Sequence, residues 1–338
     1  MAMTIYDISK KAGVSIATVS RVLNGSENVR PSTRKKVMDV IDKYDYTPNA
    51  FARGMGLHSL KTIGILCADS SDLFLAKAVY FLEQELQANG YESLLCCTGY
   101  NPDIKKNYLN LILSKKVDSI ILVGSHFIGF NEDENQYIKD VSTQVPIMLL
   151  NASFDHPNVY STLCDDYGTM FEAATEMIQS GITDILYLYD SKSYSGLKKL
   201  HGFCDAMKEY NIPGFEKLIH FYDGNIEHLN EVADFVARIA TKGTSFHGIM
   251  TSDDSLAIGS IKYAQKKGIR IPKELSVMGY NNSMLTNCCT PELTSVDNRL
   301  ETLTHQLVQT LLGVLAGEEM PKKSIFSGKI IKRGTTLF

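Results

Sequence analysis

The chain has 338 residues, of which 44% are hydrophobic and 21% are charged, and its formal net charge is −4. This length exceeds one typical domain and is ample for a large apolar core. No apolar run reaches the length of a membrane span, and the N-terminus lacks the basic and apolar regions of a signal peptide. We therefore expect a protein of the cytoplasm that has no membrane partner.

The charges are distributed unevenly along the chain. Residues 1–60 contain nine Lys or Arg and five Asp or Glu, which gives +4, whereas the remaining residues contain 25 and 33, which gives −8. A basic N-terminal part on an acidic body is typical of a protein that contacts phosphates with one end only.

Residues 4–25 have the pattern of two short helices joined by a tight turn. Thr4 is a suitable N-cap, and Asp7 completes a capping-box pattern three residues later. Gly13 permits a reversal of the backbone, and Ser15 is expected to cap the second helix. The outer face of that helix carries short side chains and one arginine, which suits a helix in the major groove of DNA. The spacing alone also fits a helical hairpin that never contacts DNA.

A third helix is predicted to start at Pro31, a favourable first helical position. Val37, Val40, Ile41 and Tyr44 then repeat at helical spacing and give this helix an apolar face. Three small helices of this kind make a compact headpiece of about fifty residues.

These residues resemble the lactose-repressor (LacI/GalR) family of bacterial transcription regulators. The segments that carry the resemblance are 4–8, 12–15, 18–24, 32–34 and 46–50. The resemblance continues more loosely to the end of the chain. It implies a helix-turn-helix headpiece over residues 1–48, a hinge helix or linker over 49–60, and a core for effector binding and dimerisation over 61–338.

Residues 49–57 could form a short helix, too short to be stable alone in water. In the resembled family, this hinge helix folds on DNA beside its dimer partner and inserts one apolar residue into the minor groove. Met55 takes that position, where the family usually has Leu, with Ala52 beside it and Arg53 nearby. Gly54 and Gly56 are further departures from the family pattern. The DNA contacts expected over the whole N-terminal part are Thr4, Ser15, Ile16, Ala17, Thr18, Ser20, Arg21, Asn24, Asn28, Thr33, Tyr46, Asn49, Ala52, Arg53 and Met55.

From residue 61 onward, buried strands alternate with amphipathic helices, which predicts an α/β fold of mostly parallel sheets. The resemblance implies a two-lobed core of the periplasmic-binding-protein type. The chain would cross between the lobes near residues 162, 292 and 322. Lobe 1 would then comprise about 61–161 and 293–321, and lobe 2 about 162–292 and 322–338.

Ligands of such lobes bind beyond the carboxyl ends of the strands, where polar clusters follow apolar runs. Each clustered residue also has a purely structural interpretation: Asp253 or Asp254 as a helix cap, and Asn281 as a turn residue. Lys199 stands where the family commonly has Arg, so it offers a point charge in place of a fork. Gly224 replaces a frequent aromatic. The expected effector contacts are Asp69, Phe74, Ser125, Asn151, Asp253, Asp254 and Asn281, to which the resemblance adds Lys199 and Asn298.

The resulting hypothesis is a dimeric DNA-binding repressor, controlled by a small polar effector such as a sugar. Two alternatives stay open: a catabolite-control type with a phosphoprotein co-repressor, and a regulator of a non-sugar ligand. A solute-binding protein would lack the headpiece. We find no hydrolase, zinc or phosphate-loop motif, and the seven Cys form no CxxC, so we expect no enzyme, metal or cofactor. The histidines at 126, 201, 247 and 305 are isolated and are expected to be structural or exposed.

Overall fold

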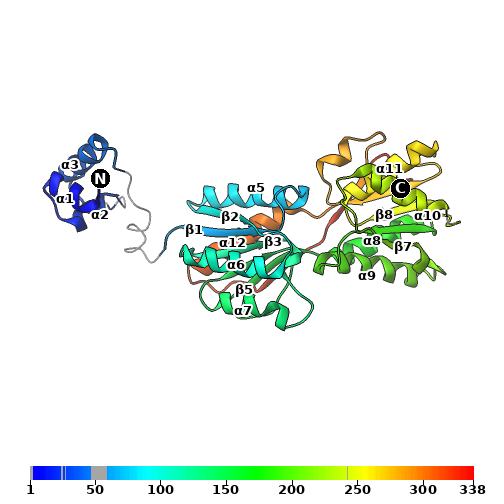
Figure 1. Ribbon diagram of the computed structural model, residues 1–338, viewed down its shortest axis with the longest axis horizontal. Coiled ribbons are helices and arrows are strands. Elements are labelled where there is room, and N and C mark those ends of the chain that lie inside the picture. Colours follow the sequence, from blue (N-terminus) through cyan, green and yellow to red (C-terminus); the bar gives the residue numbers. More distant parts are fainter. Residues whose placement is uncertain (1–2, 24–25, 27, 47–58, 242) are drawn as a thin grey trace. The chain divides into compact units, whose positions relative to one another are not determined.

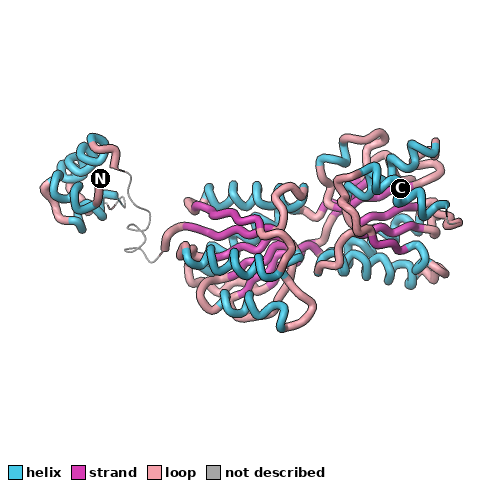
Figure 2. The backbone as a smooth tube through the Cα atoms, viewed as in Figure 1, coloured by secondary structure: helices cyan, strands magenta, loops and turns pink. Residues whose placement is uncertain are grey.

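The computed structural model describes residues 3–23, 26, 28–46, 59–241 and 243–338 (Figures 1 and 2). The chain divides into a small helical unit at the N-terminus, here called the headpiece, and a large α/β unit, here called the core. The expected hinge residues Ala52, Arg53 and Met55 lie outside the described residues, as do Asn24 and Asn49.

The described part of the headpiece contains three short helices: α1 (Ile5–Ala12), α2 (Ile16–Leu23) and α3 (Pro31–Lys43). The predicted capping box is present, because Thr4 accepts from the Asp7 amide and the Asp7 carboxylate accepts from the Thr4 amide. Gly13 ends α1 with a φ of 64°, a left-handed conformation that costs glycine little. The buried side chains of this unit are Ile8, Val19, Val22, Val29, Val37, Ile41 and Tyr46.

Lobe 1 of the core contains a six-stranded sheet of order β11-β5-β4-β3-β1-β2. The strand pairs with a described register are parallel, and β3 and β4 are buried along their whole length, as is usual for parallel strands covered on both faces. One face packs against α5 and α12, whereas α6 and α7 lie on the other (Figure 1). The bounds are β1 Thr62–Cys67, α5 Leu73–Ala88, β2 Glu92–Cys97, α6 Pro102–Ser114, β3 Ser119–Val123, α7 Gln136–Ser142, β4 Ile147–Leu150, β5 Val159–Cys164, α12 Leu300–Leu315 and β11 Lys323–Phe326.

Lobe 2 contains a second six-stranded sheet, of order β12-β10-β9-β8-β6-β7. Helices α8 and α9 pack on one face, and α10 and α11 pack on the other. Strand β12 is antiparallel to its neighbour β10, and the other pairs are parallel. The bounds are α8 Asp166–Gln179, β6 Ile185–Tyr189, α9 Tyr194–Glu209, β7 Ile219–Phe221, α10 Leu229–Thr241, β8 Gly248–Thr251, α11 Asp254–Lys267, β9 Ser276–Tyr280, β10 Thr294–Asp297 and β12 Lys329–Ile331.

The chain crosses between the lobes three times, after β5, after β10 and after β11. Each crossing lies a few residues beyond the expected positions near 162, 292 and 322. The reason is that β5, β10 and β11 end at residues 164, 297 and 326, and the chain leaves each sheet only after these strands. Strand β10 therefore belongs to lobe 2 and strand β11 to lobe 1, the reverse of the expected assignment. No helix among the described residues is long and apolar enough to span a membrane.

Candidate DNA interface and effector cleft

Helix α2 presents one face to the headpiece core and leaves the opposite face open. Val19 and Val22 are buried, whereas Ile16 is 38% exposed and Ala17 and Arg21 are also exposed. This division follows from helical spacing, since the buried positions repeat every three residues. The exposed face therefore offers small apolar groups and one guanidinium, which are the groups that contact thymine methyls and guanine edges in a major groove.

Ser15 begins this helix in the manner expected of an N-cap. Its hydroxyl accepts from the backbone amide of Thr18 at 3.2 Å and lies 2.9 Å from the Thr18 hydroxyl. The other described residues of the predicted DNA set are exposed or half-buried, with one exception. Tyr46 is only 8% exposed and packs in the headpiece core. Its ring therefore stabilises the fold of the headpiece. In this it differs from the other predicted DNA contacts, which are accessible to solvent.

In the core, a polar cleft lies between the carboxyl ends of the two sheets. Its inner part is a cavity of about 90 Å³, lined by both lobes. This volume is well below the roughly 300–1,000 Å³ of typical ligand pockets. The cavity shares several lining residues with a wider mouth of about 780 Å³. A bound ligand would therefore occupy the inner cavity and extend into the mouth.

Lys199 forms part of the lobe 2 wall of this cavity. It stands one helical turn after Ser195 on α9, so both side chains lie on the same face of the helix. Its Nζ donates to the carbonyl oxygen of Ser252 at 3.0 Å and lies 3.9 Å from the centre of the Tyr280 ring. The side chain is only 7% exposed, so its position is fixed by protein contacts.

A buried carboxylate supports this wall from below. Asp166 accepts from the Ser195 hydroxyl at 2.5 Å and from the Tyr280 hydroxyl at 2.7 Å. Burial raises the pKa of Asp166, whereas the nearby Lys199 and the two hydroxyl donors act to lower it. Asp166 thus links the first turn of α8 to α9 and to the end of β9.

Lobe 1 contributes an acidic and aromatic wall. Asp72 caps α5 by accepting from the Leu75 amide at 2.8 Å, and burial raises its pKa. Tyr100 meets the ring of His126 edge-on at 4.8 Å. Burial, together with the neighbouring Lys105, lowers the pKa of His126 to about 4, so this imidazole is uncharged at neutral pH.

The two lobes touch inside the cleft. The Ser125 hydroxyl, which follows β3 of lobe 1, donates to the Ser193 hydroxyl of lobe 2 at 2.8 Å. Asn151, which follows β4, also lines the cavity and is only 8% exposed. No described residue forms a hydrogen bond with its side-chain amide. This amide is therefore available to a ligand.

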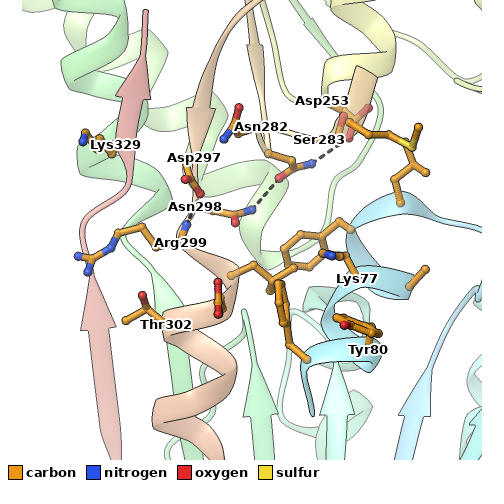
Figure 3. Close-up of a pocket in the computed structure, with 18 residues that line it drawn as sticks. Lys77, Tyr80, Asp253, Asn282, Ser283, Asp297, Asn298, Arg299, Thr302 and Lys329 are labelled. Atoms are coloured by element: carbon orange, nitrogen blue, oxygen red, sulfur yellow. Dashed lines mark hydrogen bonds between the residues drawn. The ribbon is translucent and has the colours of Figure 1, made fainter. Parts of the chain in front are cut away.

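Two side-chain amides and one carboxylate form a row of hydrogen bonds that leads from the cleft to the residue after β10. Asn281 donates to Asp253 at 2.8 Å and accepts from Asn298 at 3.0 Å (Figure 3). On its other side, this row borders a groove of about 720 Å³ lined by α5 of lobe 1 and by lobe 2 loops. Figure 3 labels Lys77 and Tyr80 on the α5 side of this groove.

The structure brings most of the predicted effector residues to one place. The residues that line the inner cavity are Phe74, Ser125, Asn151, Lys199, Asp253 and Asn281. Asp69 lines the mouth, and Asn298 lines the groove. Asp254 lines none of these spaces: it is 1% exposed and accepts from Ser283 and Ser295 at 2.6 Å each. Its role is to hold the loop after β9 against β10.

The sequence left several wall residues out of the expected set. Asp72 and Asp190 lie in the polar clusters 69–74 and 189–193 that follow strands, so their position nominates them, but neither was among the expected contacts. Tyr100 and His126 gave no such signal, because each reads as an isolated aromatic. His126, which was expected to be structural or exposed, lines the inner cavity.

Residues 4–49 match the family model described as bacterial regulatory proteins, lacI family, and residues 174–336 match a periplasmic binding protein-like domain. Over 99% of its length, the chain is 50% identical to an HTH-type transcriptional regulator of Lachnoclostridium phytofermentans, which is covered completely. It is 33% identical to catabolite control protein A of Priestia megaterium, with 88% of this chain and 87% of that protein covered.

The fold agrees with a solved structure, that of the lac repressor dimer bound to operator and the anti-inducer ONPF. The TM-score is 0.87 with 100% of both chains covered, at 21% sequence identity. The predicted fold class, a helix-turn-helix headpiece followed by a two-lobed α/β core, is confirmed. The chain belongs to the lacI family of bacterial regulatory proteins and is a DNA-binding transcriptional regulator.

Proposed function

We propose that this protein is a repressor that binds a near-palindromic operator as a homodimer and is controlled by a small polar effector in the core cleft. The observation that carries the proposal is the pairing of two features in one chain. The headpiece has an exposed face on α2 that can read DNA. The core has a polar cleft, inside which a hydrogen bond between Ser125 and Ser193 joins the two lobes.

The DNA part of the proposal rests on the size of the headpiece. Three short helices present a single reading helix, which is enough for one half-site, so two copies are needed for a specific operator. Selection from randomised duplexes with the full-length protein should return a sequence with two-fold symmetry. A consensus that corresponds to one half-site only would contradict the dimer model.

The dimer part rests on apolar side chains that both lobes expose around the groove of Figure 3. Leu73 and Tyr80 on α5 are 42% and 52% exposed, and Met284 of lobe 2 is 69% exposed. Leu94 and Leu95 on the edge strand β2 are also exposed. Clustered apolar surface of this kind is typical of protein interfaces. Tyr80→Glu should lower the mass found by sedimentation to that of the monomer, whereas Lys106→Glu on α6 should not.

The effector part rests on the cavity and on the amide of Asn151. A thermal-shift screen of sugars, sugar phosphates and nucleobases, followed by operator titrations with each binder, tests it. A binder that leaves operator affinity unchanged would contradict the proposed control.

A second candidate follows from the 33% identity to a protein named catabolite control protein A. In that case, a phosphoprotein would act as co-repressor. The same operator titration separates the two candidates: a small effector changes operator affinity by itself, whereas a co-repressor protein has to be added.

A further inference from the structure

We propose that the ligand of the core cleft carries a protonated amine among its hydroxyl groups. This inference rests on the proposed function, because it specifies the chemical class of the effector for that cleft. It is argued from the charges that line the cleft and its mouth, from one aromatic ring, and from one unpartnered amide.

Carboxylates far outnumber cations around the space. Among the described residues that line the cavity and its mouth, Lys199 is the one Lys or Arg. His126 adds no positive charge at neutral pH, because burial lowers its pKa to about 4. Both lobes contribute to the negative side. The acidic lining residues are Asp69, Asp72, Asp190, Asp223, Glu227 and Asp253.

The charge of Lys199 is directed toward lobe 2. It acts on Asp166 and Asp253, whose carboxyl pKa values it helps to lower against the effect of burial. Its Nζ is held by the Ser252 carbonyl and by the Tyr280 ring. Asp69 and Asp72 of lobe 1 face the cleft without a cation of their own. A second positive charge in the space between the lobes would therefore be stabilised.

Tyr100 marks where that charge would lie. Its ring is 52% exposed, lines both the cavity and the mouth, and stands among three carboxylates. Burial and the charges of Asp72, Asp69 and Asp190 raise the pKa of Tyr100 to about 12. An aromatic face beside carboxylates is a favourable environment for an organic ammonium group, which gains from both.

Asn151 points to a ligand independently of the charges. It lines the inner cavity, it is nine-tenths buried, and its side-chain amide has no partner among the described residues. Its amide atoms are not among the fully buried unpartnered polar atoms, so they are open to the cavity and a ligand can bond to them. An amide both donates and accepts, which matches a hydroxyl group.

Other ligand classes fit less well. The described residues include no group of three or more side chains that could hold a metal ion, so an inorganic cation lacks a coordination shell here. A phosphate or carboxylate ligand would approach several carboxylates with no arginine to pair with. A ligand with hydroxyl groups alone would bond to Asn151 but would leave the excess of negative charge in place.

The test compares sugars that differ in one group, using the full-length protein and calorimetry at one fixed salt concentration. The series is glucosamine, glucose, N-acetylglucosamine and glucose 6-phosphate, together with galactosamine and galactose. Glucosamine and galactosamine should bind at least about tenfold more tightly than glucose and galactose, respectively, as expected for one charge-assisted hydrogen bond. A neutral or phosphorylated sugar that binds as tightly would overturn the inference, and so would an absence of binding by both amine sugars at millimolar concentration.

Variants test which carboxylates cause the preference for an amine sugar. Asp72→Asn and Asp190→Asn should each remove most of this preference, while binding of the corresponding neutral sugar changes little. Asparagine keeps the capping role of Asp72 and can still accept from Ser252, so the fold is retained. Asp234→Asn, on the surface of α10, serves as the matched control. Operator titrations test the proposed function separately. A neutral sugar that weakens operator binding would support the proposed repressor function and would contradict the inference that the ligand carries an amine.

Discussion

The hydroxyl groups of Ser125 and Ser193 form a 2.8 Å hydrogen bond that joins lobe 1 to lobe 2 inside the core cleft. Ser193 also caps α9, the helix that carries Lys199. A change in the separation of the lobes would therefore act directly on the helix that forms one wall of the cavity. This contact connects closure of the cleft to the position of the buried cation.

Removal of that contact should favour the open cleft. We predict that Ser125→Ala weakens binding of a cleft ligand by about 1 kcal/mol, the usual net contribution of one such bond. Calorimetry with a ligand from the screen measures the loss. Ser114→Ala, on the exposed surface of α6, is the control and should bind normally. Unchanged affinity in Ser125→Ala would mean that the contact has no part in ligand binding.

Lys199 should be essential for the shape and charge of the cavity wall. Lys199→Met keeps the length of the side chain but leaves the Ser252 carbonyl without its donor and Asp166 without its nearby cation. We predict at least a tenfold loss of ligand affinity, with operator binding in the absence of ligand retained. Lys198→Met on the exposed side of α9 is the matched control. Equal losses in the two variants would indicate a general effect on the helix.

Arg21 should read a base, because its guanidinium lies on the open face of α2. Its replacement by alanine should cost roughly 1–3 kcal/mol per half-site on the selected operator. Fluorescence titrations with cognate and random duplexes at the same salt concentration measure the cost. Lys36→Ala, an exposed basic residue on α3, should weaken both duplexes alike. If Arg21→Ala also weakens both alike, its role is a phosphate contact.

Ile16 and Ala17 should set part of the operator preference, since both are exposed at the start of α2. As apolar groups they should favour thymine methyl groups over hydrogen-bonding base edges. Replacing both by glutamine should change the consensus obtained from randomised duplexes. The same consensus from the variant would assign operator choice to other residues.

Asp254 should make the core less stable as the pH rises from about 4 to 7. Burial and the neighbouring Asp253 raise the pKa of Asp254 to about 7 from its ordinary 3.8. Between these values the Asp254 carboxyl binds more protons in the folded than in the unfolded chain, so its contribution to the free energy of unfolding falls as pH rises from about 4 to 7 and stays lower above. Asp253 and Asp166 have raised pKa values and act in the same direction. His126, whose pKa burial lowers to about 4 from its ordinary 6.5, acts in the opposite direction.

Urea unfolding at several pH values between 5 and 8 measures this slope. Asp254→Asn should flatten it in part, because an amide cannot ionise and the other two carboxyl groups remain. Asp234→Asn on the surface should leave the slope unchanged. The same slope in Asp254→Asn and in the wild type would show that Asp254 does not titrate in this range.

Long apolar runs made most of the fold predictable from the sequence. The sequence predicts a strand over residues 62–67, because this run is continuously apolar, and a helix over 73–89, because apolar residues repeat at helical spacing. Strand β1 (Thr62–Cys67) and helix α5 (Leu73–Ala88) agree with these bounds to within a residue. Strands β5, β10 and β11 were not predicted. Serine, threonine, lysine or aspartate interrupts each of them, and β11 pairs with β5, which lies about 160 residues earlier in the chain. The positions of the three crossings depend on these strands, which explains why the expected crossings came early.

The candidate site shows the same limit. Residues that directly follow a strand, such as Ser125 and Asp253, were predictable from their position. Asp166 and Tyr280 were not, because one reads as a helix N-terminal residue and the other as the last apolar position of a strand. Their 2.7 Å hydrogen bond joins segments more than a hundred residues apart, and no local pattern indicates it.

The three crossings also determine when the lobes can form during synthesis. Helix α12 supplies Leu303, Leu307 and Leu311 to the core of lobe 1, and strand β11 completes its sheet, yet both follow most of lobe 2 in the chain. A nascent chain that has emerged only to β5 therefore exposes an apolar sheet face that α5 covers only in part. Neither sheet has all of its strands before the last segment has left the ribosome, so we expect both lobes to be completed at the end of translation.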